Sequence, residues 1–182
     1  MPQLDVPYFN QRANRFDPDR SCNTAAVAMI MAFYGIVGDG SSLSLPDQVF
    51  VWMRDNRLSR YSHADLVRAF AWKGLRSRFT TTGTMEDIEN EIDAGRPVAV
   101  SGFFTPGGHI VVVSGYDRER QLLTVCDPYG EYFSTGYVKN DRSKSDAEGQ
   151  RSVFRYSTFE RLCTTGARGR REGIWMHRVN RI

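Results

Sequence analysis

The chain has 182 residues, a size that suits one domain with its own hydrophobic core. Hydrophobic residues make up 41% of it and charged residues 25%, which is typical of a globular protein and excludes a disordered one. The net charge of +3 is too small to indicate a nucleic-acid partner, and we expect none.

Membrane and targeting signals are missing from the sequence. No stretch approaches the roughly 20 consecutive apolar residues of a membrane helix. Residues 1–6 lack the basic and apolar regions of a secretory signal peptide. We therefore expect no membrane span and, by default, a cytoplasmic location, with export by another route left open. Nothing in the sequence indicates the oligomeric state.

The three cysteines, Cys22, Cys126 and Cys163, are odd in number and widely scattered. No C-x-x-C pair occurs, so we expect neither a metal site nor a disulfide framework, and no cofactor. We interpret Cys126 as strand filling and Cys163 as a structural residue or a free thiol. The densest basic cluster, residues 168–171, predicts a solvated loop, with a weak anionic contact as the alternative.

Helical signals dominate the first half of the chain. Residues 22–34 are apolar on every side, which predicts a buried helix with Ser21 as its N-cap and Gly35 just after its end. Ser62 and Thr84 are also in N-cap positions. Three further helices are expected at about residues 47–57, 63–73 and 85–94.

The pattern changes to β-branched runs after residue 95. Extended segments are expected at residues 4–9, 97–101, 110–116, 122–126 and 173–179. A short helix at 157–162 and a polar, mobile loop at 139–150 complete the second half. The result is an α+β fold in a single domain, 1–182, with a helical subdomain at about 12–95 and a sheet subdomain at about 96–182.

The polar turn at residues 117–120 predicts that the strands on either side form a hairpin. If the turn centres near 118–119, the numbers of paired residues sum to about 236 or 237. His109 then lies opposite residue 127 or 128, which brings Asp127 within reach of its ring. A carboxylate that orients an imidazole is the partner that a Cys–His nucleophile pair requires.

These residues suggest an acyl-transfer mechanism. A thiol on the first turn of a helix lies in the positive field of the helix N-terminus, which favours the Cys22 thiolate. His109 would move the proton, and Asp127 would fix its tautomer. The backbone N–H of Cys22 and the side-chain amide of Gln11 are candidate donors to the oxyanion.

Several blocks of sequence resemble the double-glycine-leader (bacteriocin-processing) peptidase-like family of papain-like cysteine peptidases. They lie at residues 6–11, 22–35, 92–98, 108–117 and 127–128. In that family the residues at the positions of Cys22, His109 and Asp127 form the triad, and the glutamine at the position of Gln11 serves the oxyanion hole. The resemblance implies a papain-like fold and a cysteine peptidase that hydrolyses a peptide or protein substrate through a thioester acyl-enzyme.

Other functions stay open beside the peptidase. The resemblance extends to the phytochelatin synthases, which implies acyl or peptidyl transfer as one alternative. A cell-wall or virion structural module that retains the peptidase fold is another. The sequence contains no transporter domain, so we do not expect a leader peptidase fused to an exporter.

Each candidate residue also has a purely structural interpretation. Cys22 could be a buried apolar residue, His109 a core histidine, Asp127 the cap of a turn, and Gln11 an ordinary loop residue. Residues 103–106 either line a substrate groove or pack in the core. His63 is expected in the first turn of a surface helix and His177 in an edge strand, each without a partner.

Overall fold

A computed structural model describes residues 1–133, 136–137, 149–166 and 169–182 of the chain. Its main sheet contains β1 (Leu75–Gly83), β2 (Val98–Gly102), β3 (His109–Asp117), β4 (Leu122–Cys126), β7 (Ser152–Arg155) and β10 (Ile174–Arg181). All pairings in it are antiparallel, in the order β1-β10-β2-β3-β4-β7. Two short ribbons pair β5 (Tyr132–Phe133) with β6 (Gly136–Tyr137) and β8 (Thr165–Gly166) with β9 (Gly169–Arg170).

The helices begin and end close to the predicted positions. They are a short 3-10 helix η1 (Gln11–Ala13), then α1 (Cys22–Phe33), α2 (Leu45–Asp55), α3 (His63–Trp72), α4 (Met85–Asp93) and α5 (Tyr156–Thr164). The Ser62 and Thr84 side chains cap α3 and α4 as predicted, each accepting from a backbone N–H three residues on. Within the described residues, each helix is too short or too polar to traverse a bilayer.

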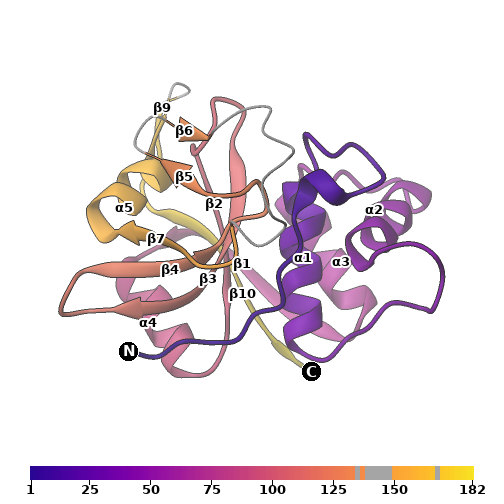
Figure 1. Cartoon of the computed structure of the whole chain (residues 1–182), viewed down its shortest axis with the longest axis horizontal. Helices are drawn as coiled ribbons and strands as arrows, with labels where there is room; N and C mark the ends of the chain where they lie inside the picture. The colour runs from indigo at the N-terminus through magenta and orange to yellow at the C-terminus, as the bar shows by residue number, and fades with distance from the viewer. Residues whose placement is uncertain (134–135, 138–148, 167–168) are drawn as a thin grey trace.

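The sheet separates two hydrophobic clusters (Figure 1). One cluster contains α1, α2 and α3 against one face, where Ala99, Ile110 and Val112 contribute from the strands. The other contains α4 and α5 against the opposite face, with Val111 and Val113 among its members. Because both faces of the sheet are covered, every residue of β3 is buried, and its central residues 110–113 form a continuous apolar run rather than an alternating pattern.

One prediction about the first half of the chain was wrong, and a second, Ser21 as the N-cap of α1, was confirmed in position but not in its side-chain bond. Strand β1 lies inside the range predicted as a helical subdomain, and it pairs with β10 along the edge of the sheet. Helix α4, in the same range, packs on β2 and β3. The Ser21 side chain makes no capping bond to α1. Its hydroxyl instead accepts from Asn14 Nδ2 at 2.9 Å, which ties the preceding loop to the start of α1.

The second half contains two further corrections. Strand β10 is not an edge strand, because it pairs with both β1 and β2. The β3–β4 hairpin is paired one to three residues away from the predicted register, with Val112 opposite Cys126 and Tyr116 opposite Leu123. A bulge between Val113 and Gly115 accompanies this shift. Most of the predicted loop at 139–150 lies outside the described residues, as does Arg168 of the basic cluster.

Candidate active site

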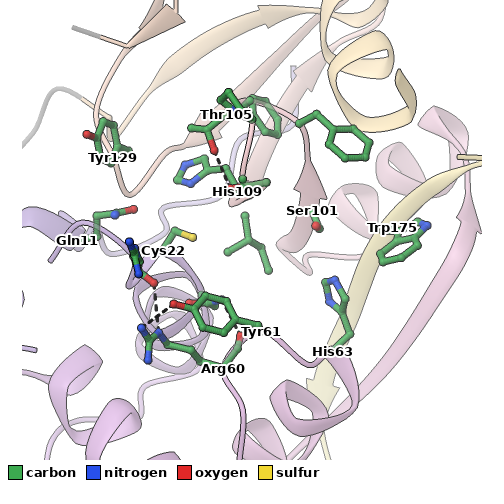
Figure 2. Close-up of a pocket in the computed structure, with 18 of the residues that line it drawn as sticks. Gln11, Cys22, Arg60, Tyr61, His63, Ser101, Thr105, His109, Tyr129 and Trp175 are labelled. Atoms are coloured by element: carbon green, nitrogen blue, oxygen red, sulfur yellow. Dashed lines mark hydrogen bonds between the residues drawn. The ribbon is translucent and has the colours of Figure 1, made fainter. Parts of the chain in front are cut away.

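Cys22 is the first residue of α1, so its backbone N–H has no partner within the helix. The helix runs through the first core cluster, and its buried residues hold the N-terminal end in a fixed position at the cleft. Figure 2 shows the Cys22 side chain in the cleft below His109. The positive end of the helix dipole favours negative charge on this sulfur.

His109 begins β3, and its ring contacts both Cys22 and Asp127. The Nε2 atom lies 2.7 Å from Asp127 Oδ1, and both side chains are buried. The other ring nitrogen, Nδ1, is therefore left for the hydrogen bond between His109 and the Cys22 thiol. The structure thus brings Cys22 together with His109 and Asp127, the pair expected from the hairpin, although the register of that hairpin differs from the prediction.

Asp127 is held by several groups that sequence reasoning missed. Its Oδ1 accepts from the Tyr129 backbone N–H at 2.9 Å, and its Oδ2 accepts from the Tyr137 hydroxyl. The Tyr8 hydroxyl donates to the Asp127 carbonyl at 2.8 Å. Only the Asp-x-Tyr spacing, which allows an Asx turn, was a visible signal. The carboxylate is therefore fixed in place from three separate segments of the chain.

The charges of this site stabilise one another. Burial alone would raise the pKa of Cys22, but the charge and hydrogen bond of His109 lower it below its ordinary value. Burial alone would lower the pKa of His109, but the negative charges of Asp127 and Cys22 raise it. The pair therefore favours a thiolate beside an imidazolium, which is the reactive form of a cysteine nucleophile.

Gln11 lies beside this pair in η1 and is 1% exposed. Its backbone N–H donates to the Pro128 carbonyl at 2.8 Å, next to Asp127 in the chain. Its Nε2 donates to the Pro18 carbonyl at 3.0 Å, while its Oε1 is buried without a partner among the described residues. The amide is thus anchored through one of its two N–H groups, and it lines the same cleft as Cys22.

The cleft has a volume of about 1150 Å³ and continues well beyond Cys22. Residues 103–106 line it, and the Phe104 ring also packs edge-on against His109 at 6.0 Å. His63 lines it too, and the expectation that His63 and His177 lack partners was wrong. His63 Nδ1 lies 2.9 Å from His177 Nε2, and His177 Nδ1 lies 3.0 Å from Ser77 Oγ.

The other two cysteines differ from Cys22. Both are buried and free, and neither lines the cleft. Burial raises the pKa of Cys126 to about 11, and it also raises the pKa of Cys163. Of the three thiols, only that of Cys22 has its pKa lowered.

The model of the Peptidase_C39-like family matches residues 3–161, most of the chain and all the candidate site residues. The chain belongs to this family. Membership confirms the resemblance seen in the sequence and supports a cysteine peptidase. Among curated proteins, no sequence matches the chain.

Two solved structures of peptidases share the fold with this member of the Peptidase_C39-like family. A double glycine motif protease from an AMS/PCAT transporter, in complex with its leader peptide, has 16% identity, a TM-score of 0.54, and coverage of 98% of this chain and 94% of its own. The peptidase domain of Streptococcus ComA has 17% identity, a TM-score of 0.52, and coverage of 97% and 96%. These likenesses confirm the expected α+β papain-like fold.

Proposed function

We propose that the chain is a cysteine peptidase that hydrolyses peptide bonds through Cys22, His109 and Asp127. The observation that carries this proposal is the hydrogen-bonded line from the Cys22 thiol through His109 to the buried Asp127 carboxylate. Cys22, at one end of this line, is the first residue of α1, and it lines a cleft large enough for a peptide. Family membership supports the same reaction class.

The chemistry follows from the protonation states of the pair. The Cys22 thiolate attacks the carbonyl carbon of the scissile bond, and the His109 imidazolium then protonates the departing amine. Water attacks the resulting thioester with His109 as the base, which restores the thiol. Asp127 keeps Nδ1 of the ring directed at Cys22 and stabilises the imidazolium, as the carboxylate does in a serine-protease triad.

The oxyanion of the tetrahedral intermediate needs donors that are already in position. The free backbone N–H of Cys22 is one. The second N–H of the Gln11 amide is the other, because the Pro18 carbonyl takes only one of the two. Since Gln11 is buried and held through its backbone, little reorganisation of its side chain is needed during the reaction.

Three single variants test this proposal on a library of peptides analysed by mass spectrometry. Cys22→Ala and His109→Ala should abolish measurable cleavage, while Gln11→Ala should lower kcat by roughly 10²–10³-fold. Cys163→Ala is the matched control, because it removes a buried thiol that does not line the cleft, and it should leave kcat unchanged. Wild-type cleavage by the Cys22→Ala protein would refute the assignment.

The same assay separates hydrolysis from acyl transfer. If water alone reaches the thioester, the products should still be those of hydrolysis after an amine or thiol acceptor is added. Accumulation of acceptor adducts at the expense of hydrolysis would make the chain a transferase with the same nucleophile. Cleavage by neither route, together with an intact fold, would favour a structural module.

A further inference from the structure

The end of the cleft away from Gln11 is built from aromatic and basic residues. In Figure 2 His63 and Trp175 lie there, well apart from Cys22 and Gln11, with Ser101 beside them. Arg171 completes this region and also lines the cleft. None of these residues takes part in the cleavage chemistry, so the region needs a separate account.

Arg171 is a half-buried cation held in one orientation. Its guanidinium lies between two rings, 4.3 Å from the centre of Phe103 and 4.0 Å from the centre of Trp175. Its Nη1 donates to the Ser101 carbonyl at 2.8 Å. Two rings and a carbonyl already fix this guanidinium. It therefore loses little further conformational freedom when it binds a ligand.

No carboxylate neutralises this cation within the part of the chain that the structure describes. Among the described residues, Arg171 donates through Nη1 alone, to the Ser101 and Cys163 carbonyls, and the N–H groups of Nε and Nη2 have no acceptor there. Burial lowers the pKa of Arg171, which reflects the cost of keeping the charge unpaired. Two adjacent guanidinium nitrogens are the geometry that binds a carboxylate through two hydrogen bonds.

His63 adds a neutral ring to this part of the cleft. Its Nδ1 is bonded to His177, its ring stacks on Phe79 at 4.1 Å, and its Nε2 has no partner among the described residues. If Ser77 donates to His177 and His177 donates to His63, then His63 Nε2 carries the proton. An anion bound beside Arg171 would select this arrangement of protons, because it turns His63 into a donor.

The charge of the whole cleft favours an anion. Of the residues that the structure describes, four arginines line it, Arg20, Arg60, Arg170 and Arg171, against one acidic residue, Asp19. Arg60 is already paired with Asp17, so it contributes little net charge. The remaining arginines give an excess of positive charge in a concave site, where low-dielectric walls strengthen the field.

We propose that Arg171 and His63 form a subsite that binds a carboxylate of the peptide substrate. The carboxylate is either an aspartate or glutamate side chain or the free C-terminus of the peptide, and the chemistry of recognition is the same for both. This inference rests on the proposed peptidase function, because it makes the distal end of the cleft a specificity site for that reaction.

Binding to the Cys22→Ala protein tests the subsite without any cleavage. The probes are acetylated, amidated heptapeptides of alanine and glycine, with glutamate or glutamine placed at each position in turn. A third set carries glutamine and a free C-terminal carboxylate. Calorimetric titration at low salt should give about tenfold tighter binding for glutamate than for glutamine at one or two positions. Tighter binding of the third set alone would identify the C-terminus as the ligand.

Matched variants in the Cys22→Ala background locate the effect. Arg171→Gln should bring the two peptides within twofold of each other, whereas Arg170→Gln removes the same charge from the neighbouring residue and should keep most of the preference. If Arg171→Gln fails to fold, Arg171→Lys retains the charge without the paired donors and should weaken the preference to about threefold. His63→Gln should weaken it less than Arg171→Gln does.

Three outcomes would overturn the subsite: equal binding of all peptides, equal loss of preference in Arg170→Gln and Arg171→Gln, or an unchanged preference in Arg171→Lys. These outcomes are distinguishable from failure of the proposed function. Cleavage of peptides by the wild-type protein without any carboxylate preference would leave the peptidase and remove the subsite. A carboxylate preference in binding with no cleavage by the wild-type protein would leave the subsite and remove the peptidase.

Discussion

Two networks of imidazoles reach one cleft, through His109 and through His63, and they favour different charge states. In the first, His109 bonds to the Asp127 carboxylate and the Cys22 thiol, and its pKa is raised. In the second, His177 bonds to His63 and to the Ser77 hydroxyl. Burial lowers the pKa of His63 to about 4 and that of His177 to about 3, with further lowering from Arg171 and from His63 respectively.

The comparison isolates the role of the carboxylate. Burial lowers the pKa of a histidine in both networks, because it disfavours the charged ring. Only the first network contains negative groups that outweigh this effect. The first network therefore favours an imidazolium beside a thiolate, while the second holds two neutral rings at neutral pH that can relay hydrogen bonds but carry no charge. The first arrangement suits proton transfer, and the second suits recognition of a ligand.

Removal of the carboxylate should have the largest effect. Asp127→Asn converts the first network to the neutral kind, because the amide keeps the shape but not the charge. We expect kcat/KM for peptide cleavage to fall by roughly 10³–10⁴-fold, with the pKa of His109 lowered. Kinetics together with the pH dependence of Cys22 alkylation would check both effects.

Asp117→Asn is the control for that variant, because Asp117 lies at the other end of β3 and is also buried. It bonds to the Arg120 backbone and to no histidine. Its kcat/KM should stay within threefold of wild type. A similar loss in both variants would mean that the effect is structural, and the comparison of charge states would fail.

The thiols should show the next largest difference. Iodoacetamide at pH 7 should modify Cys22 at least about 100-fold faster than Cys126 or Cys163, since only the thiolate reacts. The pKa of Cys22 is lowered, whereas that of Cys126 is raised to about 11. A time course of peptide masses gives the three rates. Comparable rates at Cys22 and Cys126 would show that His109 does not stabilise the thiolate.

The sequence predicted the first network because its members lie in strong local signals. Cys22 begins an apolar helix, and His109 and Asp127 flank a hairpin whose turn is visible in the residues. The predicted register was wrong, because it placed the turn too early and could not see the bulge beyond Val113. His109 and Asp127 are nevertheless in contact, because side chains as long as histidine and aspartate also reach diagonal neighbours across a strand pair.

The second network could not be predicted, because it depends on a strand that was missed. Strand β1 carries arginines at 76 and 78 on its exposed side, and a serine at 77 interrupts the apolar residues 75 and 79 on the other side, so the apolar alternation that usually reveals a strand is incomplete. Ser77 is buried because it bonds to His177, a residue 100 positions away. Only the pairing of β1 with β10 brings these two side chains together.

The second network should make the protein sensitive to acid. The pKa of His177 is about 3 in the folded protein and near 6.5 when unfolded, so the unfolded chain binds more protons between these values. Stability is therefore lost as the pH falls below about 6.5. Between pH 6.5 and 5 we expect wild type to lose about 2 kcal/mol more than His177→Gln, measured by urea unfolding.

The control for this measurement is internal, because His63 and His177 are neutral in both the folded and the unfolded state above pH 7.5. Any cost of the His177→Gln substitution itself appears there as a constant offset between the two proteins. Parallel curves down to pH 5 would show that His177 is not held neutral by the fold. The two networks would then differ in geometry but not in charge.

The smallest effect should come from the far end of the second network. Ser77→Ala removes the hydroxyl that bonds to His177 Nδ1 and leaves that nitrogen buried without a partner. We expect a loss of about 1–2 kcal/mol in the free energy of unfolding at pH 7, with kcat unchanged because the Cys22–His109 pair is untouched. Urea unfolding and peptide kinetics on the same preparation measure both. A fall in kcat that matches the Asp127→Asn variant would mean that the two networks are coupled across the cleft, and the division between charge and recognition would no longer hold.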